Sequence, residues 1–416
     1  MKQISFFILF FAFSLTALSD NWPQWRGPTY NGISVEKGLP VEWSEGENVA
    51  WKLKLPGGSS ATPIVWGKKI FLMAQTDKQI SLLCVSTSGE NLWMMKVADS
   101  RAKGASEKTL ASPSPSTDGK RVYAMTGEGE VVAVDFAGKE VWRFNAQERY
   151  GRFRLGFGYH TTPVLHDGRL YLQLIHSGGA WVVAIDAASG REIWKVERPS
   201  DGTNECEHAY TSPSIWSRAS DAQLITHGND YAIGHRLIDG KELWRVAELN
   251  PKERYNRTLR FVASPVVSPD LIVIPSAKGR GVVGLMPGAS GIILPGNKSE
   301  QWRLTRGTPD VVSPLIYGKE IYLNRENGSI ACLNAATGKK QYEERAHAQT
   351  YRASPVAADG KIYVTARDGT VSVLKAGPKF EVLSKNKIAD SLTASPALAN
   401  GQIYLRGIKA LYSIGK

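Results

Sequence analysis

A serine or threonine followed by proline recurs along the chain at nearly constant spacing. Eight such pairs stand at the head of short apolar runs: Thr62-Pro63, Ser112-Pro113, Thr162-Pro163, Ser212-Pro213, Ser264-Pro265, Ser313-Pro314, Ser354-Pro355 and Ser395-Pro396. The steps between successive prolines are 50, 50, 50, 52, 49, 41 and 41 residues. Self-similarity with such a period is typical of repeat architectures, so the 416 residues need not divide into several unrelated domains.

Each repeat carries the same order of short strands and turns. In residues 162–196, TPVLHDGRLYLQLIHSGGAWVVAIDAASGREIWKV, a short strand and an Asp-Gly turn precede an alternating strand over residues 169–174. A third strand over residues 181–185 and a glycine turn follow, and a fourth strand holds Trp194. No window shows a sustained helical period of apolar residues. The pattern predicts an all-β, eight-bladed β-propeller of four-stranded antiparallel blades.

The place of the Ser/Thr-Pro pair fits this geometry. The first strand of a blade lines the central channel and is the edge of its sheet, so a proline there removes no interior ladder hydrogen bond. The blades also converge toward the axis, which favours small Ser, Thr and Ala side chains over bulky ones. We therefore expect the pairs to surround the channel.

The fourth strand of each repeat carries a large apolar residue after a glycine turn. These residues are Trp93, Trp142, Trp194, Trp244, Trp302, Tyr342 and Leu383. The eighth repeat ends after three strands, and its missing strand is found before the first repeat, in GENVAWKLKL, with Trp51 at the equivalent position. An N-terminal strand is therefore predicted to complete the last blade and close the ring.

The composition along the chain divides it into three segments. Residues 1–19 have a basic residue, an apolar run and small residues before the cleavage point, which is the pattern of a signal peptide. Residues 20–47 are a leader rich in Trp, Pro and Gly, and residues 48–416 are the predicted propeller. An uncleaved anchor is the alternative for the first segment, although its apolar run is short for a bilayer span. We expect a periplasmic or secreted protein with no lipid-anchor cysteine and no later transmembrane segment.

Charge and cysteine usage narrow the choice of partners. The formal net charge is +12, which suits an acidic protein, an anionic glycan or an anionic small molecule. A solvated basic surface with no special partner is the alternative. No Lys/Arg block points to nucleic acid, and a monomer is expected.

Cys84 and Cys332 stand where other repeats have Ala133 and Ala184, so both are interpreted as buried core residues rather than parts of a disulfide framework.

The repeat units resemble those of a known family. The segments AVDFAGKEVW, AIDAASGREIW and CLNAATGKKQY, with their Ser-Pro anchors, look like the pyrroloquinoline-quinone (PQQ)-type propeller repeat. That family covers quinoprotein alcohol dehydrogenases and the BamB-type outer-membrane assembly protein. The leader NWPQWRGPTYNGIS is similar to that of exported bacterial PQQ-like repeat proteins. The resemblance spans essentially residues 21–416 and implies the propeller fold rather than one activity.

Long connections between the first repeats concentrate charged and aromatic residues beside the anchors. Ring closure is expected to direct them to one funnel at the channel mouth, where they would bind a ligand. The candidate ligand-binding residues are Arg152, Arg154, His160, Glu207, His208, Tyr210, Arg260, Asp310 and Arg352. A polar channel that holds only water is the alternative interpretation. No catalytic residue is assigned, and no metal site is predicted, because the run Glu205-Cys206-Glu207-His208 has no second cluster at ligand spacing.

The resemblance implies two different functions. A BamB-type relationship implies an exported, non-enzymatic scaffold of the cell envelope that binds a partner and needs no cofactor. A quinoprotein relationship implies a PQQ-dependent oxidoreductase, whose cofactor is held with calcium, a catalytic Asp, an aromatic floor and two adjacent half-cystines. This sequence has no Cys-Cys pair, and Asp310 is the acid that stands beside an anchor. The binding scaffold is therefore ranked first and the PQQ enzyme second, and recognition of an anionic glycan is a third interpretation.

Overall fold

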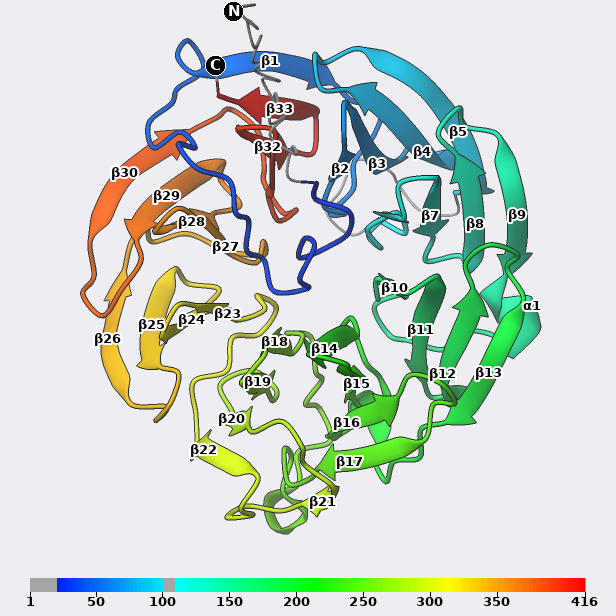
Figure 1. Cartoon of the computed structure of the whole chain (residues 1–416), viewed down its shortest axis with the longest axis vertical. Coiled ribbons are helices and arrows are strands. Elements are labelled where there is room, and N and C mark those ends of the chain that lie inside the picture. Colours follow the sequence, from blue (N-terminus) through cyan, green and yellow to red (C-terminus); the bar gives the residue numbers. More distant parts are fainter. Residues whose placement is uncertain (1–20, 101–108, 416) are drawn as a thin grey trace, which may run out of the picture.

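The computed structural model describes residues 21–100 and 109–415. Within these residues the strands form eight sheets that radiate from a central channel, as Figure 1 shows. In each sheet the first strand of the repeat lies nearest the channel, and the fourth strand lies at the outside except in one sheet, where a fifth strand is added beyond it. The prediction of an all-β, eight-bladed propeller is confirmed. The predicted signal peptide over residues 1–19 lies outside the described residues.

The blades are numbered in chain order. Blade 1 consists of β2 (Ile64–Trp66), β3 (Lys69–Gln75), β4 (Gln79–Ser86) and β5 (Asn91–Asp99), and blade 2 of β6 (Ser116–Thr117), β7 (Arg121–Met125), β8 (Glu130–Asp135) and β9 (Glu140–Asn145). Blade 3 consists of β10 (Val164–His166), β11 (Arg169–His176), β12 (Gly179–Asp186) and β13 (Glu192–Glu197), and blade 4 of β14 (Ser214–Arg218), β15 (Asp221–Gly228), β16 (Tyr231–Arg236) and β17 (Glu242–Val246). Blade 5 consists of β18 (Val266–Ser268), β19 (Leu271–Pro275), β20 (Val282–Leu285) and β22 (Glu300–Leu304), and blade 6 of β23 (Leu315–Tyr317), β24 (Glu320–Asn324), β25 (Ser329–Asn334) and β26 (Lys340–Arg345). Blade 7 consists of β27 (Val356–Ala358), β28 (Lys361–Thr365), β29 (Thr370–Lys375) and β30 (Val382–Lys387), and blade 8 of β31 (Ala397–Ala399), β32 (Gln402–Arg406), β33 (Ala410–Ile414) and β1 (Val49–Lys54).

Helices make only a small contribution to the described residues. They are one short α-helix, α1 (Ala146–Tyr150), and two 3-10 turns, η1 (Asn204–Glu207) and η2 (Lys252–Arg254). In this part of the chain, no helix has both the length and the apolar character that a membrane crossing requires.

The ring closes as the sequence predicts. Strand β1 pairs antiparallel with β33, so residues 49–54 and residues 410–414 share blade 8. Trp51 lies opposite Ser413, in the position that tryptophans occupy in other blades. The three cysteines are free and buried, which agrees with the core interpretation of Cys84 and Cys332.

The anchor hydroxyls are linked around the channel. In seven successive steps, the backbone N–H of one anchor residue donates to the side-chain hydroxyl of the next blade's anchor, over 2.8–3.0 Å. The accepting residues, which we call the hydroxyl ring, are Ser114, Thr162, Ser212, Ser264, Ser313, Ser354 and Ser395. Each proline follows its ring residue and precedes the inner strand, so the pair joins neighbouring blades without interrupting a ladder.

The anchor of blade 2 differs from the sequence prediction. The segment Ser-Pro-Ser-Pro offers two registers, and Ser114 rather than Ser112 accepts the N–H of Thr62. Ser112 instead donates its hydroxyl to the carbonyl of Thr109 over 2.6 Å. The assignment of Ser112-Pro113 was therefore wrong by two residues, because local sequence alone does not distinguish two consecutive Ser-Pro pairs.

Five outer-strand tryptophans join each blade to the next one. Their indole Nε1 atoms donate to a backbone carbonyl of the following blade over 2.8–3.1 Å, and the pairs are Trp51 with Thr87, Trp93 with Phe136, Trp142 with Ala187, Trp194 with Leu237, and Trp302 with Ala335. Each ring covers a turn glycine so closely that an added Cβ would stand 2.7–2.8 Å from the indole. Only Trp302 of these five is fully buried; the other four are half-buried.

Blades 4 and 7 depart from this arrangement. A fifth strand, β21 (Gly291–Ile293), comes from the blade 5 segment and pairs in parallel with β17. It covers Trp244, which is 1% exposed and donates to Gln223 of its own blade instead of to blade 5. In blade 7, Ser384 lies opposite Val373, so the assignment of Leu383 to the tryptophan position was wrong by one residue, at a β-bulge that the sequence pattern does not reveal.

The leader crosses one end of the channel and covers the inner strands. It is the dark-blue segment that runs through the middle of the ring in Figure 1. Backbone hydrogen bonds join it to blades 1, 2 and 7, and include reciprocal bonds of 2.9 Å between Trp22 and Val65. The buried guanidinium of Arg26 donates to the carbonyls of the anchor prolines Pro314 and Pro355 over 2.6 and 3.1 Å. The leader thus satisfies polar groups on exposed sheet edges.

Candidate functional site

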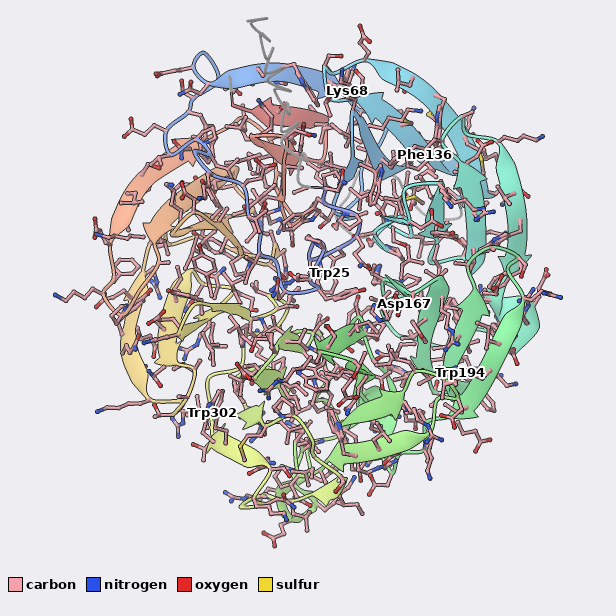
Figure 2. The ribbon with its side chains drawn as sticks, in the orientation of Figure 1. Trp25, Lys68, Phe136, Asp167, Trp194 and Trp302 are labelled. Atoms are coloured by element: carbon pink, nitrogen blue, oxygen red, sulfur yellow. The ribbon has the colours of Figure 1, made fainter. Side chains whose placement is uncertain are left out.

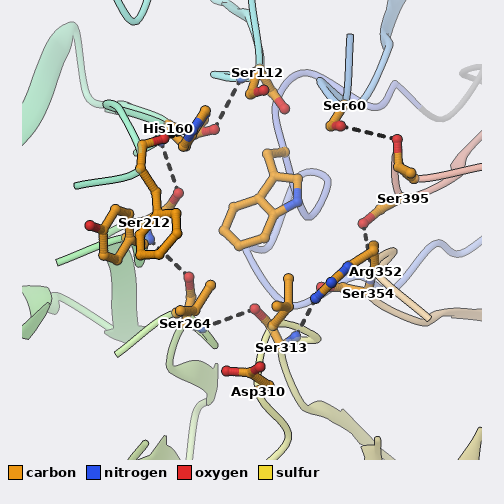
Figure 3. Close-up of a pocket in the computed structure, with 18 of the residues that line it drawn as sticks. Ser60, Ser112, His160, Ser212, Ser264, Asp310, Ser313, Arg352, Ser354 and Ser395 are labelled. Carbon is orange, nitrogen blue, oxygen red and sulfur yellow. Dashed lines mark hydrogen bonds between the residues drawn. The ribbon is translucent and has the colours of Figure 1, made fainter. Parts of the chain in front are cut away.

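A cavity of about 360 Å³ occupies the loop-rich end of the channel. We call it the channel cup, and Figure 3 shows most of the residues that line it. Its wall is the hydroxyl ring, and its rim carries residues from the connections that precede the anchors. Because the leader crosses the opposite end of the channel, the cup opens toward the loops and is closed below.

The floor of the cup is a residue that the sequence analysis did not nominate. Trp25 of the leader lines the cavity and lies near the centre of the ring in Figure 2. Its neighbours fix it in place, since Gln24 accepts the N–H of Leu165 and Arg26 is anchored to blades 6 and 7. The one hint in the sequence was the second tryptophan of Trp22-Pro-Gln-Trp25, a large side chain outside any blade.

The wall presents hydrogen-bond donors to the cavity. Every member of the hydroxyl ring lines the cup and is more than nine-tenths buried. Each hydroxyl oxygen accepts a backbone N–H, and none of the seven hydroxyl protons has an acceptor among the described residues. Since a hydroxyl donates one hydrogen bond, the ring can offer up to seven donors to a ligand or to water.

Five of the nine predicted site residues lie around the cup: His160, Tyr210, Arg260, Asp310 and Arg352. The imidazole Nε2 of His160 lies 2.7 Å from the Phe157 carbonyl, and burial lowers the pKa of this histidine. The rings of Phe157 and Tyr210 meet edge to face, with centroids 5.9 Å apart. His160, Phe157 and Tyr210 thus form an aromatic part of the rim in which the histidine is uncharged at neutral pH.

The rim carries three charged side chains, and one of them, Arg260, lies over the Phe157 ring with its guanidinium 4.7 Å from the ring centroid. Arg260 pairs with Glu205 at 3.1 Å, and Asp310 pairs with Lys278 at 3.2 Å. Arg352 makes no ion pair or side-chain hydrogen bond with any described residue, although it lines the cup and is only half-buried. The cup therefore holds one positive charge that the described part of the protein leaves unpaired.

The other four predicted residues lie outside the cup, which corrects the expectation of a single funnel. Arg152 and Arg154 are exposed, and the segment that carries them folds over blade 3, where Ser177 donates to the Arg154 carbonyl. Glu207 lines a second cavity instead, and His208 stands behind Tyr210, with 3.4 Å between Nδ1 and the phenol oxygen. These connections are long enough to pack on their own blades rather than to point at the axis.

The second cavity, of about 460 Å³, lies over the outer part of blades 3 and 4. Arg198 lines it and is completely buried, and it donates to Thr226 and to the carbonyls of Gly228 and Tyr231. These acceptors satisfy the guanidinium without a carboxylate. The positive charge here is therefore part of the packing between the two blades.

The cup offers features that suit PQQ but few oxygen ligands for calcium. Trp25 supplies a flat aromatic floor, and Arg260 and Arg352 are suitable partners for carboxylates. Calcium, however, takes six to eight oxygen ligands, usually with several carboxylates. Asp310 is the single carboxylate among the described residues that line the cup, and it is paired with Lys278. No group of three or more His, Cys, Asp or Glu residues in the described chain is arranged to hold a metal.

Three histidines near Arg198 make stability depend on pH. Burial lowers the pKa of His176 to about 4, of His227 to about 3 and of His235 to about 4, with the Arg198 charge adding to the effect at the last two. An unfolded histidine binds protons from about pH 6.5 downward, whereas these folded ones stay neutral. Protons therefore bind the unfolded state first, and stability is lost as pH falls from about 6.5 toward 4.

We expect each of these histidines to remove about 1.4 kcal/mol of unfolding free energy per pH unit within that window. Urea denaturation between pH 7.5 and about 5.5 measures the slope above the range where most carboxylates titrate. The variant His227→Phe should have a shallower slope than the parent protein. An unchanged stability across the window would show that these imidazoles accept protons in the folded state.

Comparisons with known proteins agree with this fold. A family model described as outer membrane protein assembly factor BamB matches residues 33–135, 79–292 and 295–379. The solved structure of BamB from Moraxella catarrhalis has a TM-score of 0.62 at 13% identity and covers 88% of this chain and 99% of that one. Quinohemoprotein alcohol dehydrogenase from Comamonas testosteroni has a TM-score of 0.72 at 13% identity and covers 95% and 81%. At this identity the structural likenesses show the fold alone.

A curated sequence relative matches only part of the chain. Quinohemoprotein alcohol dehydrogenase ADH IIB from Pseudomonas putida is 28% identical over 105 residues. The matched region is 24% of this chain and 14% of that enzyme, so most of the enzyme has no counterpart in the match.

Proposed function

The chain belongs to the family whose model is described as outer membrane protein assembly factor BamB, a family of PQQ-like propellers, and on this premise we propose that it is an exported, non-enzymatic binding protein of the cell envelope. In this proposal the loop-rich channel mouth holds an acidic ligand or an acidic segment of a partner protein. The signal-peptide pattern of residues 1–19 and the net charge of +12 support export and an acidic partner.

The observation that carries the proposal is the unpaired charge inside a blind cup. Arg352 lines the cavity without an ion pair to any described residue, next to hydroxyl donors that also lack acceptors. A guanidinium that is partly removed from water gains most from an anionic partner with two oxygens. Because the leader closes the lower end, the site suits retention of a group that enters from the loop side rather than passage through the ring.

A PQQ-dependent oxidoreductase is the second candidate, and the aromatic floor favours it. Trp25 lies where a flat cofactor would stack, and the propeller shares its fold with solved quinoprotein dehydrogenases. The shortage of carboxylates around the cup weighs against it. Mixing the purified protein with PQQ and calcium, and recording bound-quinone absorbance and alcohol oxidation, separates the two candidates.

Co-purification tests the first candidate. The full chain is expressed with a C-terminal tag in an exporting bacterium and isolated from the envelope, and its companions are identified by mass spectrometry of proteins and small molecules. We expect an acidic companion that is retained by the parent protein and lost from Arg352→Gln. The matched control is Arg280→Gln, an exposed arginine that does not line the cup. A companion that stays bound to Arg352→Gln would place the binding surface elsewhere and refute the proposal.

A further inference from the structure

We infer that the ligand of the channel cup is an acidic sugar residue, a hydroxylated ring that carries one carboxylate and lies on Trp25 of the leader. The inference rests on the proposed function and names the chemical class that the cup would hold. It is argued from the donors of the wall, the charge of the rim and the aromatic floor.

The wall selects a ligand that is rich in hydrogen-bond acceptors around its whole edge. The hydroxyl ring surrounds the cavity, and its seven protons have no acceptor in the described chain. A flat aromatic acid would place apolar C–H edges against most of these hydroxyls and leave them unsatisfied, which costs binding free energy. A sugar ring presents hydroxyl and ether oxygens along its edge and can accept from several of them at once.

The rim selects a single negative charge. Arg260 and Asp310 are each neutralised by a neighbour, Glu205 and Lys278, so Arg352 remains as the uncompensated charge of the cup. Its planar guanidinium matches a carboxylate through two parallel hydrogen bonds. A ligand with several negative charges would leave some of them without a partner in this cavity, because His160 is held neutral by burial.

The aromatic floor of the cup matches the apolar face of a sugar ring. The indole of Trp25 offers a flat apolar surface whose π face carries negative charge density. The axial C–H bonds on one face of a pyranose form a matching apolar patch, while its edge stays polar. The cavity of about 360 Å³ is at the lower end of the range for small-molecule sites, which suits one or two sugar units. Its open end faces the loops, so a longer acidic chain can continue outward.

The experiment measures direct binding to the purified full-length mature protein. Isothermal titration compares D-glucuronate with D-glucose, which lacks the carboxylate, and with benzoate, which lacks the hydroxyls. We expect glucuronate to bind one per chain and at least about tenfold more tightly than either analogue, as a bidentate charge-assisted pair requires. Equal affinity for benzoate and glucuronate would overturn the sugar assignment.

Variants assign each contact. Arg352→Gln should lower glucuronate affinity to that of glucose and leave glucose unchanged, whereas Arg280→Gln should change neither. Trp25→Ala should weaken both sugars by about tenfold, Trp25→Phe should retain part of the affinity, and Trp181→Ala, outside the cup, should have no effect. Melting curves establish that the Trp25 variants are folded. An unchanged glucuronate affinity in a folded Trp25→Ala variant would remove the leader from the site.

The two proposals fail in different ways. If glucuronate does not bind but an envelope companion is still lost from Arg352→Gln, the sugar assignment is wrong and the proposed binding function stands. If neither glucuronate nor an envelope companion depends on Arg352, both are wrong.

Discussion

Replacing Arg406 with leucine is expected to lower the free energy of unfolding by about 3–5 kcal/mol. Arg406 lies at the end of β32 in blade 8 and is 1% exposed. Its guanidinium donates to the carbonyls of Gly57 and Ser59 in the chain entering blade 1, to Met73 of β3 and to its own neighbour Gly407, over 2.6–3.2 Å. A buried carbonyl that loses its donor costs about 1–3 kcal/mol, and leucine supplies no donor.

The expected loss of unfolding free energy is smaller than the summed cost of four carbonyls without a donor. Burial disfavours the charged guanidinium and lowers the pKa of Arg406 to about 9, so removing the charge also relieves a desolvation penalty. The hydrogen bonds lie at the seam where blade 8 meets blade 1, so their loss weakens ring closure as well as local packing.

Urea denaturation followed by tryptophan fluorescence measures the change. Arg306→Leu is the matched control, because Arg306 is exposed and should alter the midpoint very little. Arg406→Lys keeps the charge but cannot reach four carbonyls, and it should fall between the parent protein and the leucine variant. A leucine variant as stable as the parent would mean that water or the backbone replaces these donors at no cost.

Most features of the fold that the sequence predicted correctly follow from the Ser/Thr-Pro repeat. Regular Ser/Thr-Pro spacing and a missing last strand were enough to place Trp51 in blade 8, since a propeller must close. The register failed where local pattern offered two solutions. Ser112 and Ser114 are equivalent as Ser-Pro pairs, and Leu383 and Ser384 are separated only by a bulge. A hydrogen bond to the neighbouring blade decides the first case, and strand pairing within blade 7 decides the second. Neither is visible in the local sequence.

The site was predictable only for residues tied to the repeat. His160, Tyr210, Arg260, Asp310 and Arg352 stand two to four residues before an anchor serine or threonine, so the inner strand fixes where they lie. Residues farther from an anchor, such as Arg154 and Glu207, follow the folding of long connections over their own blades. Trp25 was missed because the leader has no repeat, and its path depends on which inner edges need hydrogen bonds.

The leader links the stability of the ring to the shape of the cup. The inner strands of the blades are open sheet edges, and the leader supplies partners to blades 1, 2, 3, 6 and 7. The same contacts hold Trp22 against blade 1 and leave Trp25 beneath the cavity. A segment that is needed to cover sheet edges therefore also builds the floor of the candidate site.

Replacing Trp244 with alanine is expected to lower the free energy of unfolding by about 3–5 kcal/mol, and Trp142→Ala is expected to cost clearly less. Trp244 is 1% exposed in the core shared by blades 4 and 5, and its indole donates to Gln223 over 2.8 Å. Trp142 and Trp194 occupy the equivalent position of the repeat, but both of these are half-buried on the outer strands. Their truncation removes less area from contact with protein and opens toward solvent instead of leaving a closed cavity.

The physical reason for the difference is the strand that covers blade 4. Strand β21 pairs with β17 at Trp244 itself, and Gly234 lies so close beneath the indole that an added Cβ would stand 2.2 Å from it. Truncation there removes the surface on which β21 packs, whereas Trp142 carries no additional strand. Urea denaturation of both variants, with hydrogen exchange on residues 291–293, measures the two parts of the effect. Equal losses at both positions, or unchanged exchange in β21, would show that the fifth strand does not depend on Trp244.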